Sequence, residues 1–124
     1  MKSYTDINQS KVLTTILPLE SADMIYPHFI RMGADTYDVI PVVVEVGDVD
    51  YPYDHPCWSL AALLGVLAKI ASKIDDDGSA ALSSFMGQWS VNMFDCPVEA
   101  TDNYDNPIDA CYNMIIKLNE LKML

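Results

Sequence analysis

The chain of 124 residues has little positive charge. Seven Lys and Arg residues stand against 18 Asp and Glu, which gives a formal net charge of −11. Two long segments, 32–68 and 74–116, contain no Lys or Arg. Proteins bind nucleic acids by neutralising phosphates with these side chains, so we expect no direct binding to DNA or RNA.

The acidity leaves three interpretations. An acidic surface could dock a basic protein partner, or it could imitate nucleic acid towards a protein that binds it. It could also serve only to keep a small, apolar-rich protein soluble. We favour solubility and keep the other two as functional hypotheses.

Long hydrophobic runs are also missing. No stretch approaches the roughly 18 consecutive apolar residues that a membrane span needs, and residues 1–11 lack the apolar run of a signal peptide. The three cysteines, Cys57, Cys96 and Cys111, are odd in number and match no disulfide framework. We therefore expect a cytoplasmic protein with free thiols and no membrane segment.

Glycine is scarce, with five residues, and none has the spacing of a phosphate-binding loop. The Cys and His spacings fit no zinc site. The sequence therefore gives no reason to expect a cofactor. A hydrophobic content of 51% is typical of a globular protein, and the length suits a single domain over residues 1–124.

Hydrophobic periodicity predicts three helices. Asp6 and Gln9 have the spacing of a capping box at the start of the first, and Pro18 ends it. Asn106 is a typical N-cap for the last, with Pro107 at its first position. The middle helix is apolar on most sides, which places it in the middle of the core. The predicted helices cover 6–17, 57–73 and a segment beginning at Pro107.

Strands are predicted where β-branched or alternating residues cluster. The clearest are Tyr37–Val46 and a hairpin of 80–86 and 88–94 around Gly87, and 96–101 could add a short strand. Residues 47–56 read as a loop. The order helix, strand, helix, hairpin, helix predicts an α+β fold, with a small antiparallel sheet of about three or four strands packed against three helices.

Three segments resemble small uncharacterised proteins of gut Bacteroides-type bacteria and their phages or mobile elements. They are Lys11–Met24, Cys57–Leu67 and Asp105–Leu124. The resemblance implies a cytosolic protein of bacterial or phage origin. It supplies no catalytic residues.

Cys57 is the strongest candidate for a catalytic residue. We expect it at a helix N-terminus, where the dipole and free amides lower a thiol pKa. Cys57-Trp58 followed by small apolar residues also resembles the nucleophile helix of papain-like enzymes, although the Gly-Ser that precedes that cysteine is missing. His28 or His55 would be the general base. Nearby acids would raise the thiol pKa, and we favour a buried, structural Cys57.

Asp48, Asp50 and Asp54, with His55 beside them, form a possible site for a divalent metal. The calcium-loop pattern fails here, because Pro52 falls where a side-chain oxygen is required. A solvated loop is the interpretation we favour.

The sequence thus favours a non-enzymatic protein-interaction module, with a small cysteine-dependent hydrolase using Cys57 as the alternative. The expected partner is a protein, and a basic one if the acidic surface is the contact face. The edge strand at 42–46 is the candidate for homodimerisation. Four tyrosines in or near acidic loops are candidate contact residues, although we favour packing at core edges for them: Tyr37, Tyr51, Tyr53 and Tyr104.

Overall fold

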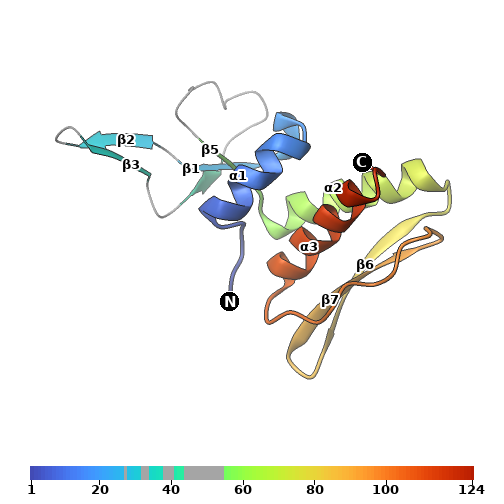
Figure 1. The fold of residues 1–124 in the computed structure, drawn as a ribbon. Coiled ribbons are helices and arrows are strands. Elements are labelled where there is room, and N and C mark those ends of the chain that lie inside the picture. Colours follow the sequence, from blue (N-terminus) through green and yellow to red (C-terminus); the bar gives the residue numbers. More distant parts are fainter. Residues whose placement is uncertain (27, 32–33, 38–40, 44–54) are drawn as a thin grey trace. The chain divides into compact units, whose positions relative to one another are not determined.

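The computed structural model describes residues 1–26, 28–31, 34–37, 41–43 and 55–124 (Figure 1). They form a mixed α/β structure with three helices and antiparallel strands. The chain divides into two compact units, Tyr4–Ser59 and Met1–Ser3 with Leu60–Leu124. The single domain over 1–124 stays a prediction.

The Tyr4–Ser59 unit begins with helix α1, Ile7–Ile16. Its capping box is confirmed: the Gln9 backbone N–H donates to the Asp6 carboxylate at 2.8 Å, and the Asp6 N–H donates to the Gln9 side chain at 3.1 Å. The helix ends before Pro18, whose ring cannot continue it, and a single 3₁₀ turn, η1 (Leu19–Ser21), follows.

Among the described residues of this unit, five short strands follow. Strand β1 (Met24–Tyr26) is the centre of a three-stranded antiparallel sheet between β4 (Val42–Val43) and β5 (His55–Cys57). Helix α1 packs against β5. Strands β2 (His28–Arg31) and β3 (Ala34–Tyr37) form a separate hairpin.

The strand predicted over Tyr37–Val46 falls mostly outside the described residues. Tyr37 ends β3 and Val42–Val43 form β4, while residues 38–40 and 44–46 lie outside them. Of the predicted loop over 47–56, residues 47–54 lie outside, and the last two belong to β5.

The start of the middle helix was predicted three residues too early. Helix α2 spans Leu60–Ile74, so Cys57 lies in strand β5 and not at a helix N-terminus. Hydrogen bonds to other segments hold the intervening backbone: Thr5 exchanges bonds of 2.9 and 3.1 Å with Trp58. The carboxylate of Asp23 accepts from both the N–H and the hydroxyl of Ser59. The bond from the Thr5 N–H engages the Trp58 carbonyl, which would accept within a helix that began at Cys57, and the segment instead continues from strand β5.

In the other unit, α2 packs against α3 (Pro107–Glu120), and both helices pack against a hairpin. The predicted cap of α3 is confirmed, because the Asn106 side chain accepts from the Asp109 N–H at 2.9 Å. The core side chains come from α2, β7 and α3: Leu63, Leu67, Ile70, Val91, Met93, Ile108, Met114, Ile115 and Leu118.

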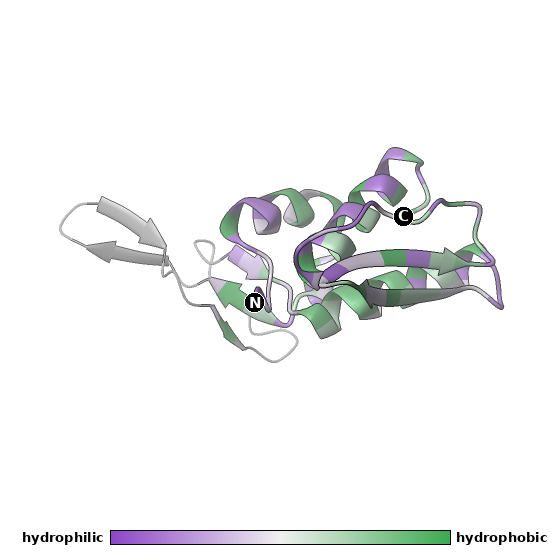
Figure 2. Ribbon diagram, turned by 90° about the horizontal axis from the view of Figure 1, so that it is seen from below, coloured by the Kyte–Doolittle hydropathy of each residue, from purple (hydrophilic) through white to green (hydrophobic). Residues whose placement is uncertain are grey.

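Helix α2 is apolar on most sides, as Figure 2 shows by its green colour, but only one side of it is buried. Ala61, Gly65 and Ala68 lie on the opposite side and are exposed. The expectation of burial all round was therefore wrong. Ala and Gly have little apolar area, so their exposure costs little.

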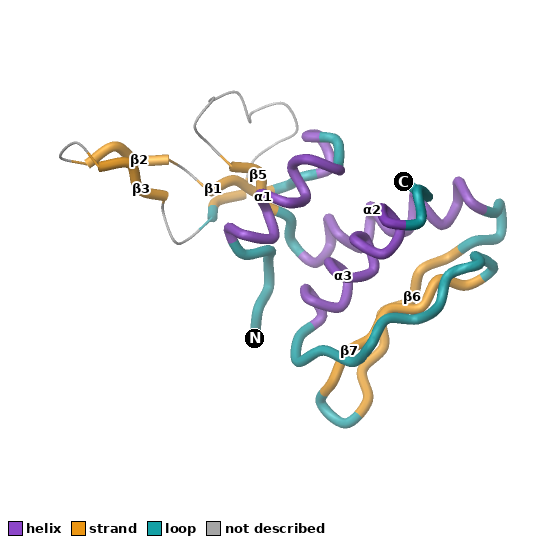
Figure 3. Tube along the Cα trace, viewed as in Figure 1, coloured by secondary structure: helices purple, strands orange, loops and turns teal. Residues whose placement is uncertain are grey.

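The predicted hairpin is confirmed as β6 (Ser79–Phe85) and β7 (Gln88–Phe94) (Figure 3). Its turn residues Met86 and Gly87 have φ of 52° and 79°, the positive values that a two-residue type I′ turn requires.

Segment 96–101 forms no strand, contrary to expectation. The chain turns at Asp95, whose φ is 58°, and meets β7 further on. Tyr104 forms an isolated bridge with Trp89 there. The single sheet of three or four strands is also not confirmed, because the described strands fall into one three-stranded sheet and two hairpins.

The N-terminal residues belong with the second unit. The Leu60 N–H donates to the Ser3 carbonyl at 3.3 Å, and Lys2 forms an ion pair of 3.0 Å with Asp109. Immediately beyond Ser3, Tyr4 forms an antiparallel bridge with Ser59 inside the Tyr4–Ser59 unit.

Burial of the Cys111 thiol predicts a pH-dependent stability. Burial raises its pKa from 9.0 to about 12, so the folded chain keeps this proton at pH values where the unfolded chain loses it. This contribution to stability is complete below about pH 9 and is lost as the pH rises towards about 12. Between about pH 9.5 and about pH 10.5, the free energy of unfolding of the wild type should fall more steeply than that of Cys111→Ala, by about 1 kcal/mol per pH unit.

Urea unfolding across this pH range measures the slopes. Ile115→Val also shrinks the core but removes no titrating group, so it should keep the wild-type slope. Equal slopes for wild type and Cys111→Ala would contradict the assignment.

Candidate functional site

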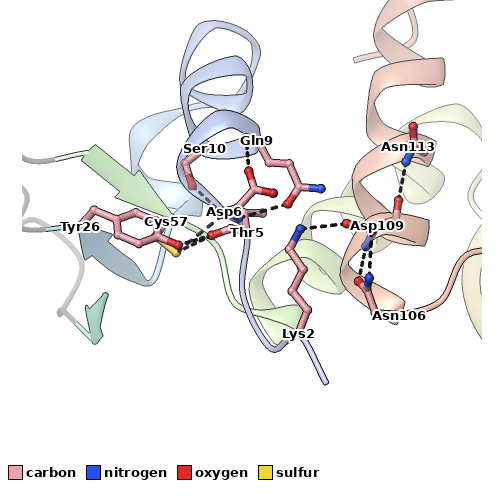
Figure 4. Close-up of polar contacts among 10 residues, drawn as sticks. All are labelled: Lys2, Thr5, Asp6, Gln9, Ser10, Tyr26, Cys57, Asn106, Asp109 and Asn113. Carbon is pink, nitrogen blue, oxygen red and sulfur yellow. Dashed lines mark hydrogen bonds and ion pairs between the residues drawn. The ribbon is translucent and has the colours of Figure 1, made fainter. Parts of the chain in front are cut away.

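Cys57 lies in a buried polar cluster of the Tyr4–Ser59 unit, with no exposed surface (Figure 4). Thr5 is the centre of this cluster. Its carbonyl accepts from the Tyr26 hydroxyl at 2.6 Å and lies 3.5 Å from the Cys57 Sγ. Its own hydroxyl is 2.8 Å from that of Ser10 and accepts from the Trp58 N–H at 3.1 Å. These bonds join α1, β1 and β5.

The electrostatics of this cluster keep the Cys57 thiol protonated. Burial raises its pKa, and hydrogen bonds from Thr5, Tyr26 and Ser10 offset that effect only in part. Burial, and the nearby Cys57, also raise the pKa of Tyr26. A nucleophilic cysteine needs a lowered thiol pKa together with access to substrate. The cluster therefore has a structural role, which is to connect α1, β1 and β5.

The two candidate bases are placed differently. His55 lies in β5 two residues before Cys57, so the two residues share a face of the strand with Cα atoms about 7 Å apart. The backbone of His28 begins β2, and its side chain lies outside the described part.

The metal candidates Asp48, Asp50 and Asp54 lie outside the described residues. Within the part that the structure describes, no group of three His, Cys, Asp or Glu side chains could hold a metal ion. No helix in that part is long and apolar enough to cross a membrane.

A second candidate site is a cavity of about 350 Å³ in the other unit, which we call the acidic groove. One wall is the segment after β7, and the other is the side of α3 that faces away from the core. The helix contributes residues at helical steps of three and four. The lining residues are Glu99, Ala100, Thr101, Asp102, Tyr104, Asn113, Ile116, Lys117 and Glu120.

Hydrogen bonds to β7 fix the loop wall of the acidic groove. Thr101 donates its N–H to the Val91 carbonyl at 3.0 Å and accepts from the Val91 N–H through its hydroxyl at 2.9 Å. Tyr104 and Trp89 exchange two backbone bonds of 2.7 and 2.8 Å. This segment therefore holds its acidic side chains on a backbone that is tied to the sheet.

The helix wall is fixed from the first turn of α3. Asn113 donates its side-chain amide to the Asp109 carbonyl at 2.8 Å. The carboxylate of Asp109 in turn accepts from Lys2 at 3.0 Å and from the side chain of Asn106 at 2.8 Å.

The acidic groove has a net negative lining. It contains the three carboxylates of Glu99, Asp102 and Glu120 and one ammonium group, that of Lys117, which donates to the Glu99 carbonyl at 3.1 Å across the two walls. Burial, together with Asp102 and Asp109, raises the pKa of Tyr104, so its hydroxyl stays neutral. The groove thus offers carboxylates, an amide and a phenol, which suit a cationic, hydrogen-bonding group.

The sequence indicated parts of this groove but not the whole. Tyr104 was named as a possible contact residue in an acidic loop. The meeting of that loop with Asn113, Lys117 and Glu120 was missed. Their signal was the polar spacing of three and four residues along the last helix.

Comparison of the chain with protein-family models, curated proteins and solved structures finds no match.

Thiol labelling should separate the three cysteines. Cys57 and Cys111 have no exposed surface, whereas Cys96 is half-buried. Under native conditions near neutral pH, we expect a chromogenic disulfide reagent to label Cys96 alone and slowly, because burial and the acids Asp75 and Asp95 raise its pKa. Cys96→Ala should show no native labelling. Labelling of Cys57 faster than the same thiol in the urea-unfolded chain would support the hydrolase interpretation instead.

Loss of the Thr5 hydroxyl should destabilise the fold. Thr5→Val keeps the shape of the side chain but leaves the Trp58 N–H and the Ser10 hydroxyl without this partner in a buried place. The cost should be roughly 2 to 4 kcal/mol of unfolding free energy, measured in urea.

Thr15→Val is the matched control, because Thr15 is exposed on α1 and its hydroxyl bonds only the local Val12 carbonyl. We expect a change within about 0.5 kcal/mol. An equal loss of unfolding free energy in the two variants would contradict this structural role of the Thr5 hydroxyl.

Proposed function

We propose that this chain is a non-enzymatic protein-interaction module whose acidic groove receives a basic segment of a protein partner. The observation that carries the proposal is a cavity of about 350 Å³ lined by Glu99, Asp102 and Glu120 on two fixed walls. Its volume falls in the range of small-ligand pockets, roughly 300 to 1,000 Å³. A Lys or Arg side chain has the charge and the donors that this lining requires.

The net negative charge of the chain also favours a basic protein partner, and it acts at longer range than the contacts in the groove. With a net charge of −11, the chain attracts basic proteins before contact and speeds their association. The Lys117 ammonium donates to the Glu99 carbonyl, so it leaves the net charge of the lining negative but lowers it from three carboxylates to a net of two.

The alternative, a cysteine-dependent hydrolase, has less support. Its nucleophile would be Cys57, a thiol that has no exposed surface and whose pKa is raised by burial. The cytoplasmic location and the bacterial or phage origin rest on the sequence and its resemblance alone, and they stay predictions.

Titration with a short arginine-rich peptide, followed by calorimetry, tests the groove. Glu99→Gln, Asp102→Asn and Glu120→Gln together remove its negative charges and keep side-chain size. We expect affinity to fall roughly tenfold, since exposed ion pairs contribute about 0.2 to 1 kcal/mol each.

The matched control neutralises three exposed acids in the turn before β6, with Asp75→Asn, Asp76→Asn and Asp77→Asn. It changes the net charge by the same amount and should keep most of the affinity. An equal loss in both triple variants would show that net charge alone binds the peptide, and the groove would lose its assigned role.

A further inference from the structure

Strand β6 has an open edge. Among the described strands it pairs with β7 alone. Phe85 and Gln88 close the two-residue turn, and such a closing pair is hydrogen-bonded in an antiparallel hairpin. Hydrogen-bonded and non-hydrogen-bonded pairs then alternate along the strand. Ala80, Leu82 and Ser84 fall at the non-hydrogen-bonded pairs, so their backbone N–H and C=O groups point away from β7.

The opposite edge of the hairpin confirms this alternation. Trp89 and Val91 are the β7 partners of Ser84 and Leu82. Their outward backbone groups are the ones that bond Tyr104 and Thr101 at 2.7 to 3.0 Å. The β7 edge is thus covered, and the outward backbone groups of β6 are the ones available for pairing with another strand.

Nothing in the composition of β6 protects this edge. Proteins usually place charges or Pro on exposed edges. Residues 79–94 contain no Asp, Glu, Lys, Arg or Pro, in a chain with a net charge of −11. Both helices pack against one face of the hairpin, on which Val91 and Met93 are buried. Their cross-strand partners Leu82 and Ala80 lie on the same face. The other face carries Ser79, Ala81, Ser83 and Phe85.

We propose that the β6 edge pairs antiparallel with the β6 edge of a second copy of this chain, centred on Leu82. In this register, Leu82 faces Leu82 of the second copy, and Ala80 faces Ser84. All three residues with outward backbone groups then fall at hydrogen-bonded pairs. The two hairpins become one four-stranded antiparallel sheet, with the helices of both copies on the same face.

The exposed aromatic rings of the outer face support a second copy as the occupant. Phe85 is 78% exposed and Phe94 is 49% exposed. Phe94 lies opposite Ser79 within the hairpin, and the register places Phe85 of the second copy opposite Ser79 from the other side. The small Ser79 side chain lets the two rings meet across it, once at each end of the interface.

The charges of the chain do not oppose this register. The acidic turn at 75–77 precedes β6, and its Asp77 would face the uncharged tip residue Gly87 of the second copy. No acidic residue faces another across the two strands. Pairing is thus self-complementary in backbone and apolar surface. The net charge of −11 on each copy opposes association at long range, so the dimer should be favoured by added salt.

Sedimentation velocity on the full chain over a concentration series tests the dimer. Ala81→Lys and Ser83→Lys add charge on the outer face without changing a buried residue. The register pairs position 81 with position 83 of the second copy, so two like-charged pairs appear and the dimer dissociation constant should rise about tenfold or more. Circular dichroism establishes that the variant is folded.

The matched control is Ser90→Lys and Asn92→Lys. These residues are the β7 partners of Ser83 and Ala81, on the same face but away from the open edge. This variant should dimerise like the wild type. Mixing the lysine variant with Ala81→Glu and Ser83→Glu should restore a mixed dimer, because opposite charges then face each other.

A wild type that stays monomeric at every concentration would overturn the proposal, as would equal weakening by the β7 control. Failure of the mixed pair to associate would overturn this register. The arginine-rich peptide should bind the monomeric variant unchanged, so the outcome is independent of the acidic groove.

Discussion

Four hydrogen bonds, three between backbone groups and one to the Thr101 hydroxyl, join Trp89 and Val91 to Tyr104 and Thr101 and organise the larger unit of this protein. They cover the β7 edge of the hairpin, which leaves β6 as the edge able to pair. They also tie Thr101 and Tyr104 to β7, which fixes the wall of the acidic groove that lies opposite α3. A few hydrogen bonds thus set both surfaces through which we propose that the chain meets other molecules.

Features with a local cause could be predicted from the sequence. The capping box of Asp6 and Gln9 and the Asn106 cap each depend on residues within one helical turn. The hairpin depends on the alternation of Trp89, Val91 and Met93 and on a tight turn at Gly87. These patterns carry their own hydrogen-bonding or steric reason, so the rest of the fold does not override them.

Features with a distant cause could not be predicted. The chain from Cys57 to Ser59 reads as the start of a helix, but Thr5 and Asp23, far away in sequence, bind its backbone and side chains. Helix α2 was expected to be buried all round because its composition does not distinguish small apolar residues such as Ala61 and Gly65 from large ones. The acidic groove also combines residues about 20 positions apart, which no short pattern connects.

The Ser3–Leu60 hydrogen bond has a topological consequence. The chain leaves the larger unit after Ser3 and rejoins it at Leu60, and these two points are neighbours. Tyr4–Ser59 is therefore an inserted unit with adjacent ends, the arrangement that tolerates exchange of a segment without breaking the host core.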